Sequence, residues 1–320
     1  MLYRLLKMLS QLALPIWCRR LTINKPELLK ETGPLLIASN HPNSFLDSVL
    51  LDTIFKQPVW SLARGDVFKK PFYIKLLNAL KILPVYRTSE GVENLSENYK
   101  TFEECIAIFR KDGIITIYSE GKCINEWHLR SLKKGTARLA VKAWDEHIPL
   151  KVLPVGINYS SFSRFGKNVF LNFGESITAT DIINEGADGQ RHLAFNSKLK
   201  SELEKLVFEI PAGNELLKKE KLAVKISLAK RILLALPALL GWLLHLPLFL
   251  PVRQLSKQKT KNTDHYDSVI TGILLITYPL YLVFITVIIL LITYSWWCTL
   301  VFPVFPFTAW AFVQLKSQLD

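Results

Sequence analysis

Short apolar runs alternate with stretches of helical periodicity between residues 34 and 175. The runs are rich in branched apolar residues, which is typical of buried strands. They lie at 35–38, 59–62, 114–118, 152–159 and 169–173. Apolar positions with helical spacing lie between them, at 45–55, 72–80, 94–111 and 135–144, and again in the basic stretch 190–228. The alternation predicts an α/β domain over residues 25–228, with a mostly buried central sheet flanked by helices.

The N-terminal segment has one polar and one apolar face at helical spacing. Arg4, Lys7 and Gln11 fall on the polar face, and five leucines line the other. We predict an amphipathic helix within residues 1–24 that lies on a membrane surface or covers the domain. An ordinary packed helix fits the same pattern. A signal peptide does not, because the apolar stretch 12–17 is short and no small-residue cleavage site follows it.

The C-terminal region contains two long apolar tracts. No Asp, Glu, Lys or Arg occurs from Val269 to Leu315, and His245 is the only titratable residue from Ile232 to Val252. As one helix the second tract would be about 70 Å long, whereas a membrane span needs about 20 residues. We therefore predict a hairpin of two helices there. The first tract is a third candidate, interrupted by prolines and a glycine, so residues 229–320 form a membrane-associated region.

Positive residues flank both apolar tracts, and cytoplasmic loops of membrane proteins carry an excess of them. Lysines and arginines precede the first tract at 218–231 and follow it at 253–261, and Lys316 ends the second. Each tract is therefore expected to return to the side from which it entered. This places the α/β domain on the cytoplasmic face of a membrane.

The chain has 320 residues and a formal net charge of +13, from 40 Lys and Arg against 27 Asp and Glu. Beside the apolar tracts, this charge favours an anionic membrane and anionic substrates over nucleic acid. The four cysteines include no C-x-x-C pair, and no cluster of ligands suggests a metal site. Four free cysteines fit a reducing compartment.

A histidine and a carboxylate lie close together directly after the first predicted strand. His41 precedes Asp47 in the segment Asn-His-Pro-Asn-Ser-Phe-Leu-Asp at 40–47. The carboxylate can accept from one ring nitrogen and fix the tautomer, which leaves the other nitrogen free to take a proton from an alcohol. The spacing from Ser44 to Asp47 also fits a carboxylate that only caps the following helix.

Four sequence blocks follow one another along the chain, and the His–Asp pair forms the first of them. They are 41–47, then 63–72 continued by Ile-Leu-Pro-Val-Tyr-Arg at 82–87, then Tyr-Ser-Glu-Gly at 118–121, and finally Val-Leu-Pro-Val-Gly at 152–156. Together they resemble the glycerolipid acyltransferase family, membrane-associated enzymes that acylate glycerol-3-phosphate and lysophospholipids. The resemblance covers about residues 30–175. It implies an acyltransferase-type α/β fold, here followed by hydrophobic membrane helices.

The resemblance implies that His41 and Asp47 are catalytic. His41 would deprotonate the acceptor hydroxyl, and Asp47 would orient the imidazole and stabilise the imidazolium. Arg87, at the end of the second block, would bind the acceptor phosphate through paired charged hydrogen bonds. A surface arginine after a strand is the alternative interpretation of Arg87.

By the same resemblance, Glu120, Gly121 and Lys122 bind the acceptor substrate. A structural cap is the alternative role for Glu120. Two departures from the family are present: five residues separate His41 from Asp47 where four are usual, and Lys122 begins a Lys-Cys-Ile sequence where Thr-Arg-Ser is frequent. A lysine can replace the positive charge of arginine but not its bidentate geometry.

The sequence therefore predicts a membrane-bound O-acyltransferase of phospholipid biosynthesis, with membrane lipids as partners and no bound cofactor or metal. Acyl-CoA or an acyl-carrier-protein thioester would be the donor. The His-Pro-Asn-Ser-Phe-Leu-Asp form and the long tail favour glycerol-3-phosphate as the acceptor. Lysophosphatidate or another lysolipid, and a non-enzymatic membrane scaffold, are the alternatives. A G-x-S-x-G hydrolase elbow, a P-loop and a dinucleotide fingerprint are absent.

Overall fold

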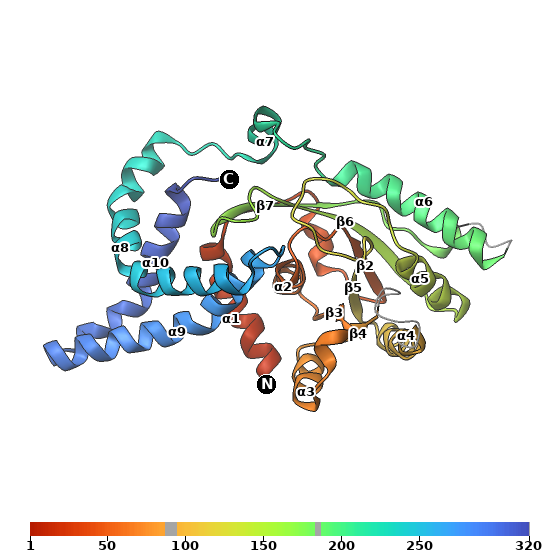
Figure 1. Ribbon diagram of the computed structural model, residues 1–320, viewed down its shortest axis with the longest axis horizontal. Helices are drawn as coiled ribbons and strands as arrows, with labels where there is room; N and C mark the ends of the chain where they lie inside the picture. The colour runs from red at the N-terminus through yellow and green to blue at the C-terminus, as the bar shows by residue number, and fades with distance from the viewer. Residues whose placement is uncertain (87–94, 183–186, 320) are drawn as a thin grey trace.

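Seven strands form a single sheet in the part of the chain that the structure describes. A computed structural model describes residues 1–86, 95–182 and 187–319. In order across the sheet, the strands are β1 (Cys18–Ile23), β7 (Lys167–Phe173), β6 (Lys151–Tyr159), β2 (Leu35–Ser39), β5 (Ile114–Tyr118), β3 (Val59–Arg64) and β4 (Ile82–Val85). Neighbouring strands are parallel except β6 and β7. The predicted α/β class is confirmed (Figure 1).

Strand β2 lies at the centre of the sheet, between β5 and β6, and pairs with both in parallel. Every residue of β2 is buried. Its apolar run has this pattern because a parallel strand is covered on both faces. The carboxyl ends of β2, β5 and β6 therefore meet at one edge of the sheet, where α/β domains form their ligand sites.

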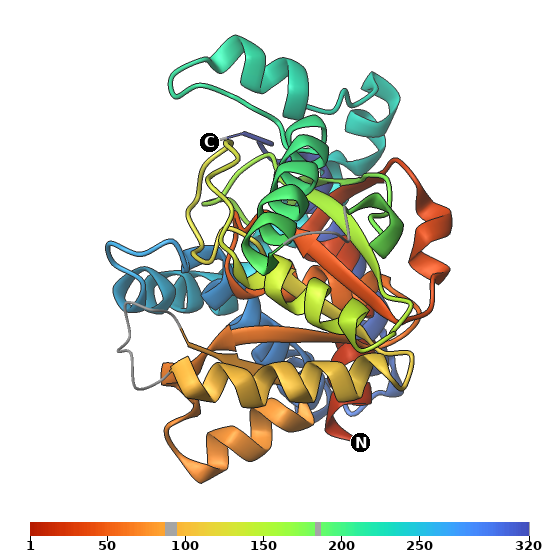
Figure 2. The ribbon, with the colours of Figure 1, turned by 90° about the vertical axis from the view of Figure 1, so that its right-hand side faces the viewer.

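Helices cover both faces of the sheet. On one face lie α4 (Leu95–Phe109), α5 (Gly135–Asp145) and α6 (Asp188–Leu206), and on the other lie α1 (Leu2–Trp17) and α2 (Phe45–Ile54). Figure 2 shows α4, α5 and α6 side by side in front of the sheet. The short helices α3 (Pro71–Ala79) and α7 (Glu215–Leu222) lie outside these layers. Between α6 and α7, residues 207–214 interrupt the stretch 190–228, which the pattern predicts as helical throughout.

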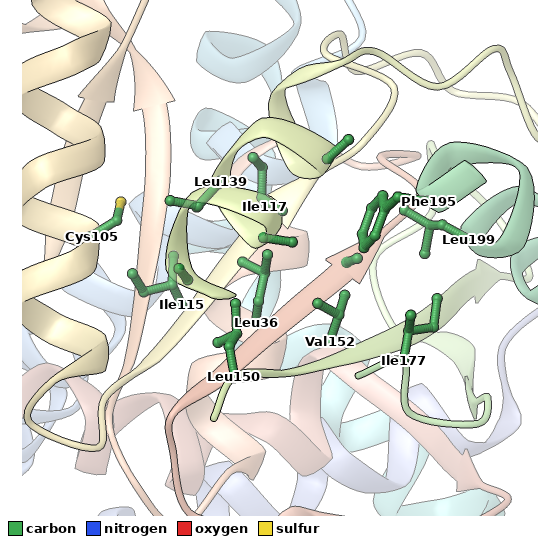
Figure 3. Packing of buried hydrophobic residues seen from close by; sticks show 14 of the residues in the cluster. Leu36, Cys105, Ile115, Ile117, Leu139, Leu150, Val152, Ile177, Phe195 and Leu199 are labelled. Atoms are coloured by element: carbon green, nitrogen blue, oxygen red, sulfur yellow. The ribbon is translucent and has the colours of Figure 1, made fainter. Parts of the chain in front are cut away.

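The first face of the sheet has an apolar core. Phe195 and Leu199 of α6 lie over Val152 of β6, and Leu36 of β2 packs in the same cluster (Figure 3). All four are completely buried. Burial of each such side chain contributes about 1.5–3 kcal/mol, so this face holds the sheet rigidly behind its carboxyl edge.

The N-terminal helix is shorter than predicted. It ends at Trp17, and Cys18–Ile23 forms the edge strand β1, paired in parallel with β7. Two side chains of its polar face contact the domain, because Lys7 Nζ donates to the carbonyl of Phe55 at 3.0 Å and Gln11 donates to that of Thr53 at 3.2 Å. Leu2, Leu5, Met8 and Leu12 are exposed, and the membrane-surface position of this helix stays a prediction.

Three C-terminal helices are long and apolar enough to cross a membrane: α8 (Leu228–Lys259), α9 (Tyr266–Thr293) and the segment Trp296–Leu315, which includes α10 (Val301–Leu315). The predicted hairpin within 269–315 corresponds to α9 and α10. The first tract forms one bent helix rather than an interrupted element or a hairpin of its own (Figure 1). Proline kinks a helix without ending it when neighbouring helices hold both parts.

Helices α8 and α10 approach closely at Gly241 of α8. A Cβ atom at this position would lie 2.0 Å from the carbonyl oxygen of Thr308 in α10. Contacts through small residues are typical of helices that pack within a membrane, where close van der Waals packing replaces the hydrophobic effect.

Candidate active site

The loop that joins β2 to α2 carries the predicted His–Asp pair. Asn40 fixes the start of this loop on β6, because its Nδ2 donates to the carbonyl of Ile157 at 3.0 Å and its Oδ1 accepts from the amide of Ile157 at 2.8 Å. The loop then turns back, and Asp47 lies in the first turn of α2. The histidine and the carboxylate, six residues apart, therefore face each other at the carboxyl edge.

The structure brings His41 and Asp47 into direct contact. His41 Nδ1 lies 2.8 Å from Asp47 Oδ2, and Asp47 is completely buried. Since the carboxylate only accepts, Nδ1 carries the proton of this bond. The same oxygen accepts from the backbone amide of Asn43 at 2.9 Å, and Oδ1 accepts from the hydroxyl of Tyr159 at 2.8 Å. Asp47 thus orients the histidine and holds the loop at Asn43, whereas the Ser44 side chain forms no capping hydrogen bond with α2.

Two tyrosines hold this pair in place. The ring of Tyr118 stacks on that of His41, with centroids 3.9 Å apart and planes inclined by 11°. Its hydroxyl lies 2.8 Å from Ser48 Oγ. Burial, followed by the charge of Asp47, raises the pKa of both Tyr118 and Tyr159 well above 10. Both phenols therefore remain neutral, and Tyr159 remains a hydrogen-bond donor to Asp47.

The second ring nitrogen of His41 is available to a substrate. No residue in the described ranges hydrogen-bonds Nε2, and the His41 side chain is 17 % exposed. With Nδ1 protonated and held by Asp47, the neutral imidazole has its lone pair on Nε2. This is the arrangement of a general base that acts on a hydroxyl.

Glu120 lies behind His41 rather than beside its free nitrogen. Its Oε2 accepts from the backbone amide of His41 at 2.8 Å and from the guanidinium of Arg130 at 2.8 Å, and its Oε1 accepts from the amide of Arg130 at 2.8 Å. The side chain is 2 % exposed. These protein donors engage both oxygens, which corresponds to the structural role that the sequence left open, and acceptor binding by Glu120 stays a prediction.

The remaining predicted substrate-binding residues lie around the same edge. Gly121 has a φ of +70°, and a Cβ there would lie 3.0 Å from Lys133 Cγ, so a side chain would be strained and crowded. Lys122 is partly exposed, and its carbonyl accepts from Arg130. Arg87 lies outside the described residues. Among the described residues, no group of three or more His, Cys, Asp and Glu side chains could hold a metal ion.

This arrangement lies within a recognisable family segment. Residues 20–158 match the family model described as Acyltransferase. The segment is therefore similar to the acyltransferase family. It contains His41, Asp47 and Glu120 together with strands β2 to β5, and it supports the resemblance stated from the sequence blocks.

Other comparisons are more distant. The crystal structure of the 1-acyl-sn-glycerophosphate (LPA) acyltransferase PlsC from Thermotoga maritima is similar, with a TM-score of 0.43 and 17 % sequence identity, over 64 % of this chain and 79 % of that chain. No curated protein has a significant match to the sequence.

The candidate active site includes residues that the sequence pattern did not indicate. Arg130 binds Glu120, Tyr159 binds Asp47, and Asp267 binds the loop between His41 and Asp47. Tyr159 ends a predicted strand, which the structure places next to β2, so its position at the end of a strand was the available signal. The sequence also contained a signal for Asp267, because this residue is the last charged one before a long uncharged tract.

Proposed function

We propose that this acyltransferase is membrane-bound and transfers a fatty acyl group from an acyl thioester to a hydroxyl of glycerol-3-phosphate. The observation that carries the proposal is the His41–Asp47 pair, with Nδ1 held by a buried carboxylate and Nε2 free of contacts from the described residues. A family member that had become a scaffold would have no need to keep this geometry.

The chemistry follows from the two nitrogens of His41. Nε2 takes the proton of the acceptor hydroxyl as its oxygen attacks the thioester carbonyl, and Asp47 stabilises the imidazolium that forms. The tetrahedral intermediate collapses, the carbon–sulfur bond breaks, and the imidazolium returns the proton to the departing thiolate. The products are an ester and a free thiol, and His41 is again neutral.

Positive groups at the same edge support a phosphorylated acceptor. Lys122 is partly exposed directly after Gly121, and the stem of Lys133 lies against Gly121. We assign to Lys122, together with Arg87, the binding of the acceptor phosphate. The ammonium group of Lys122 would bind the phosphate as a point charge, whereas the guanidinium of Arg87 would form paired hydrogen bonds with it.

The exposed apolar surfaces support binding to a membrane. The outward leucines of α1 and the apolar surfaces of α8, α9 and α10 would be covered by lipid. The basic residues that flank the apolar part of α8 support a position of the α/β domain on the cytoplasmic face. The donor, acyl-CoA or an acyl-carrier-protein thioester, would then approach from the cytoplasm.

A transfer assay with one labelled acyl-CoA tests the acceptor. The protein in vesicles is offered glycerol-3-phosphate or lysophosphatidate, and the His41→Ala variant is the control. We expect His41-dependent product from glycerol-3-phosphate. Product from lysophosphatidate alone would replace this acceptor by the lysolipid alternative. No product with either acceptor, or with acyl-carrier-protein donors, would refute the enzyme proposal and favour a scaffold.

A further inference from the structure

The base of helix α9 contacts the loop that carries the His–Asp pair. Asn43 Nδ2 donates to Asp267 Oδ2 at 2.6 Å, although 224 residues separate the two in sequence. Both side chains are buried, Asn43 completely and Asp267 to within 1 %. A candidate membrane helix thus forms a polar contact with the loop of the matched segment. The contact is at Asn43, two residues after His41 in the sequence.

A second residue of α9 completes this contact. Ser268 Oγ accepts from the backbone amide of Leu46 at 2.9 Å and donates to the carbonyl of Asn43 at 2.8 Å. The first turn of α9 therefore satisfies backbone groups on both sides of the bend in the loop. Groups of this kind need partners wherever water is excluded.

The sheet supplies the balancing charge. Lys167, in β7, forms an ion pair with Asp267 Oδ2, and its side chain is 1 % exposed. The ion pair keeps the Asp267 carboxylate charged despite its burial, because an isolated buried charge would be strongly unfavourable. The contact thus fastens three elements together: the loop, α9 and the sheet.

We propose that Asp267 is a positioning residue that sets the geometry of the His41–Asp47 pair through Asn43. The backbone amide of Asn43 donates to Asp47 Oδ2, the same oxygen that binds His41, while its side chain is held by Asp267. A shift of Asn43 therefore redirects the carboxylate. The five residues between His41 and Asp47 form a loop that does not fix this geometry alone. The role in catalysis rests on the proposed function.

Asn43→Ala is the first test variant, because it removes the amide group but leaves the buried Asp267–Lys167 ion pair intact. We expect kcat to fall by about 10- to 100-fold, as for other residues that orient a catalytic group, while KM changes little. The folded fraction of the variant in detergent should match that of the wild type. The matched control is Asp264→Asn, which removes a carboxylate from the connection between α8 and α9. The backbone carbonyl of Asp264 accepts from Asn125 at 3.4 Å, and the substitution leaves this carbonyl in place.

A double variant removes the ion pair without leaving a lone buried charge. In Asp267→Ala/Lys167→Met we expect the same loss of kcat, and adding Asn43→Ala should cause no further loss, because the three residues act as one unit. If Asn43→Ala and the double variant instead multiply their effects, or if KM alone rises, Asp267 does not act through Asn43.

A spectroscopic signal separates this inference from the proposed function. The Nδ1 proton of His41 in its bond to Asp47 should give a downfield proton resonance in histidine-labelled protein, absent in Asp47→Asn. We expect it to shift or vanish in Asn43→Ala and to stay unchanged in Asp264→Asn. An unchanged resonance in Asn43→Ala would overturn the inference. If the protein shows no transfer activity, the proposed function is refuted. The His41 resonance then still tests whether Asp267 positions the His41–Asp47 pair.

Discussion

The sheet domain and the three C-terminal helices use apolar residues in opposite ways. In the sheet domain Leu36 is completely buried within a cluster of apolar neighbours, whereas Leu291 of α9 is 63 % exposed. Conversely, Thr308 and Gln314 of α10 are among the buried residues of the helices. The first region has the pattern of a domain surrounded by water. The second has the pattern expected of helices in lipid, where polar groups turn inwards and apolar ones face outwards.

Polar contacts join the two regions at several points. Arg19 of β1 donates to the carbonyl of Val313 at 2.9 Å, and Gln314 returns a hydrogen bond to the Arg19 carbonyl at 3.2 Å. The Asp267–Lys167 pair lies at the same junction. Polar contacts fix the relative orientation of the two regions more specifically than apolar packing, which tolerates sliding. The candidate active site lies next to this junction.

The same substitution in the two regions should have very different effects. Leu36→Ala removes three side-chain carbon atoms from a closed core and should lower the free energy of unfolding by about 2–5 kcal/mol. Leu291→Ala, on the outer face of α9, should lower it by less than about 0.5 kcal/mol. Denaturant unfolding in detergent measures both. Equal losses would contradict the opposite use of apolar residues in the two regions.

A smaller effect is expected from pH at the junction. Burial lowers the pKa of Lys316 to about 8 from its ordinary value of 10.5, and the neighbouring Lys167 and Arg19 act in the same direction. The folded state therefore binds fewer protons than the unfolded state between these values, so stability increases as pH rises above 8. Because Lys316 stays partly accessible to water, we expect a gain of about 1 kcal/mol.

The Lys316→Met variant isolates this contribution. It lacks the titrating group, so the melting temperature of the wild type relative to the variant should rise between pH 8 and pH 10. The comparison also cancels the opposite effect of Cys18, whose pKa burial raises to about 12. A difference in melting temperature that does not change with pH would show that burial at the junction does not lower the pKa of Lys316.

The pattern of the sequence was sufficient for the central strands and for the His–Asp pair. The apolar runs at 35–38 and 114–118 became β2 and β5 almost to the residue, because buried parallel strands show their burial directly. His41 and Asp47 are close in sequence, so their contact depends on one local loop. Periodicity and spacing are strong signals for such features.

Contacts between residues that are distant in the sequence could not be predicted from its local pattern. The pattern predicts the end of a helix where β1 lies, because β1 is a polar edge strand whose pairing with β7 depends on residues about 150 positions away. The prolines of α8 suggested an interruption, but packing against α10 keeps the helix continuous. Asp267 reaches Asn43 only through the fold, and no local pattern encodes such a contact.

The most direct test of this account is a single-turnover measurement of acyl transfer in vesicles with Asp47→Asn. The variant preserves shape but holds His41 in the wrong tautomer, so we predict a loss of rate of about 1,000- to 10,000-fold at unchanged folded fraction. His41→Ala should lose as much, and the double variant should lose no more than either. Transfer by Asp47→Asn within a few-fold of the wild-type rate would contradict the central role of the His41–Asp47 pair.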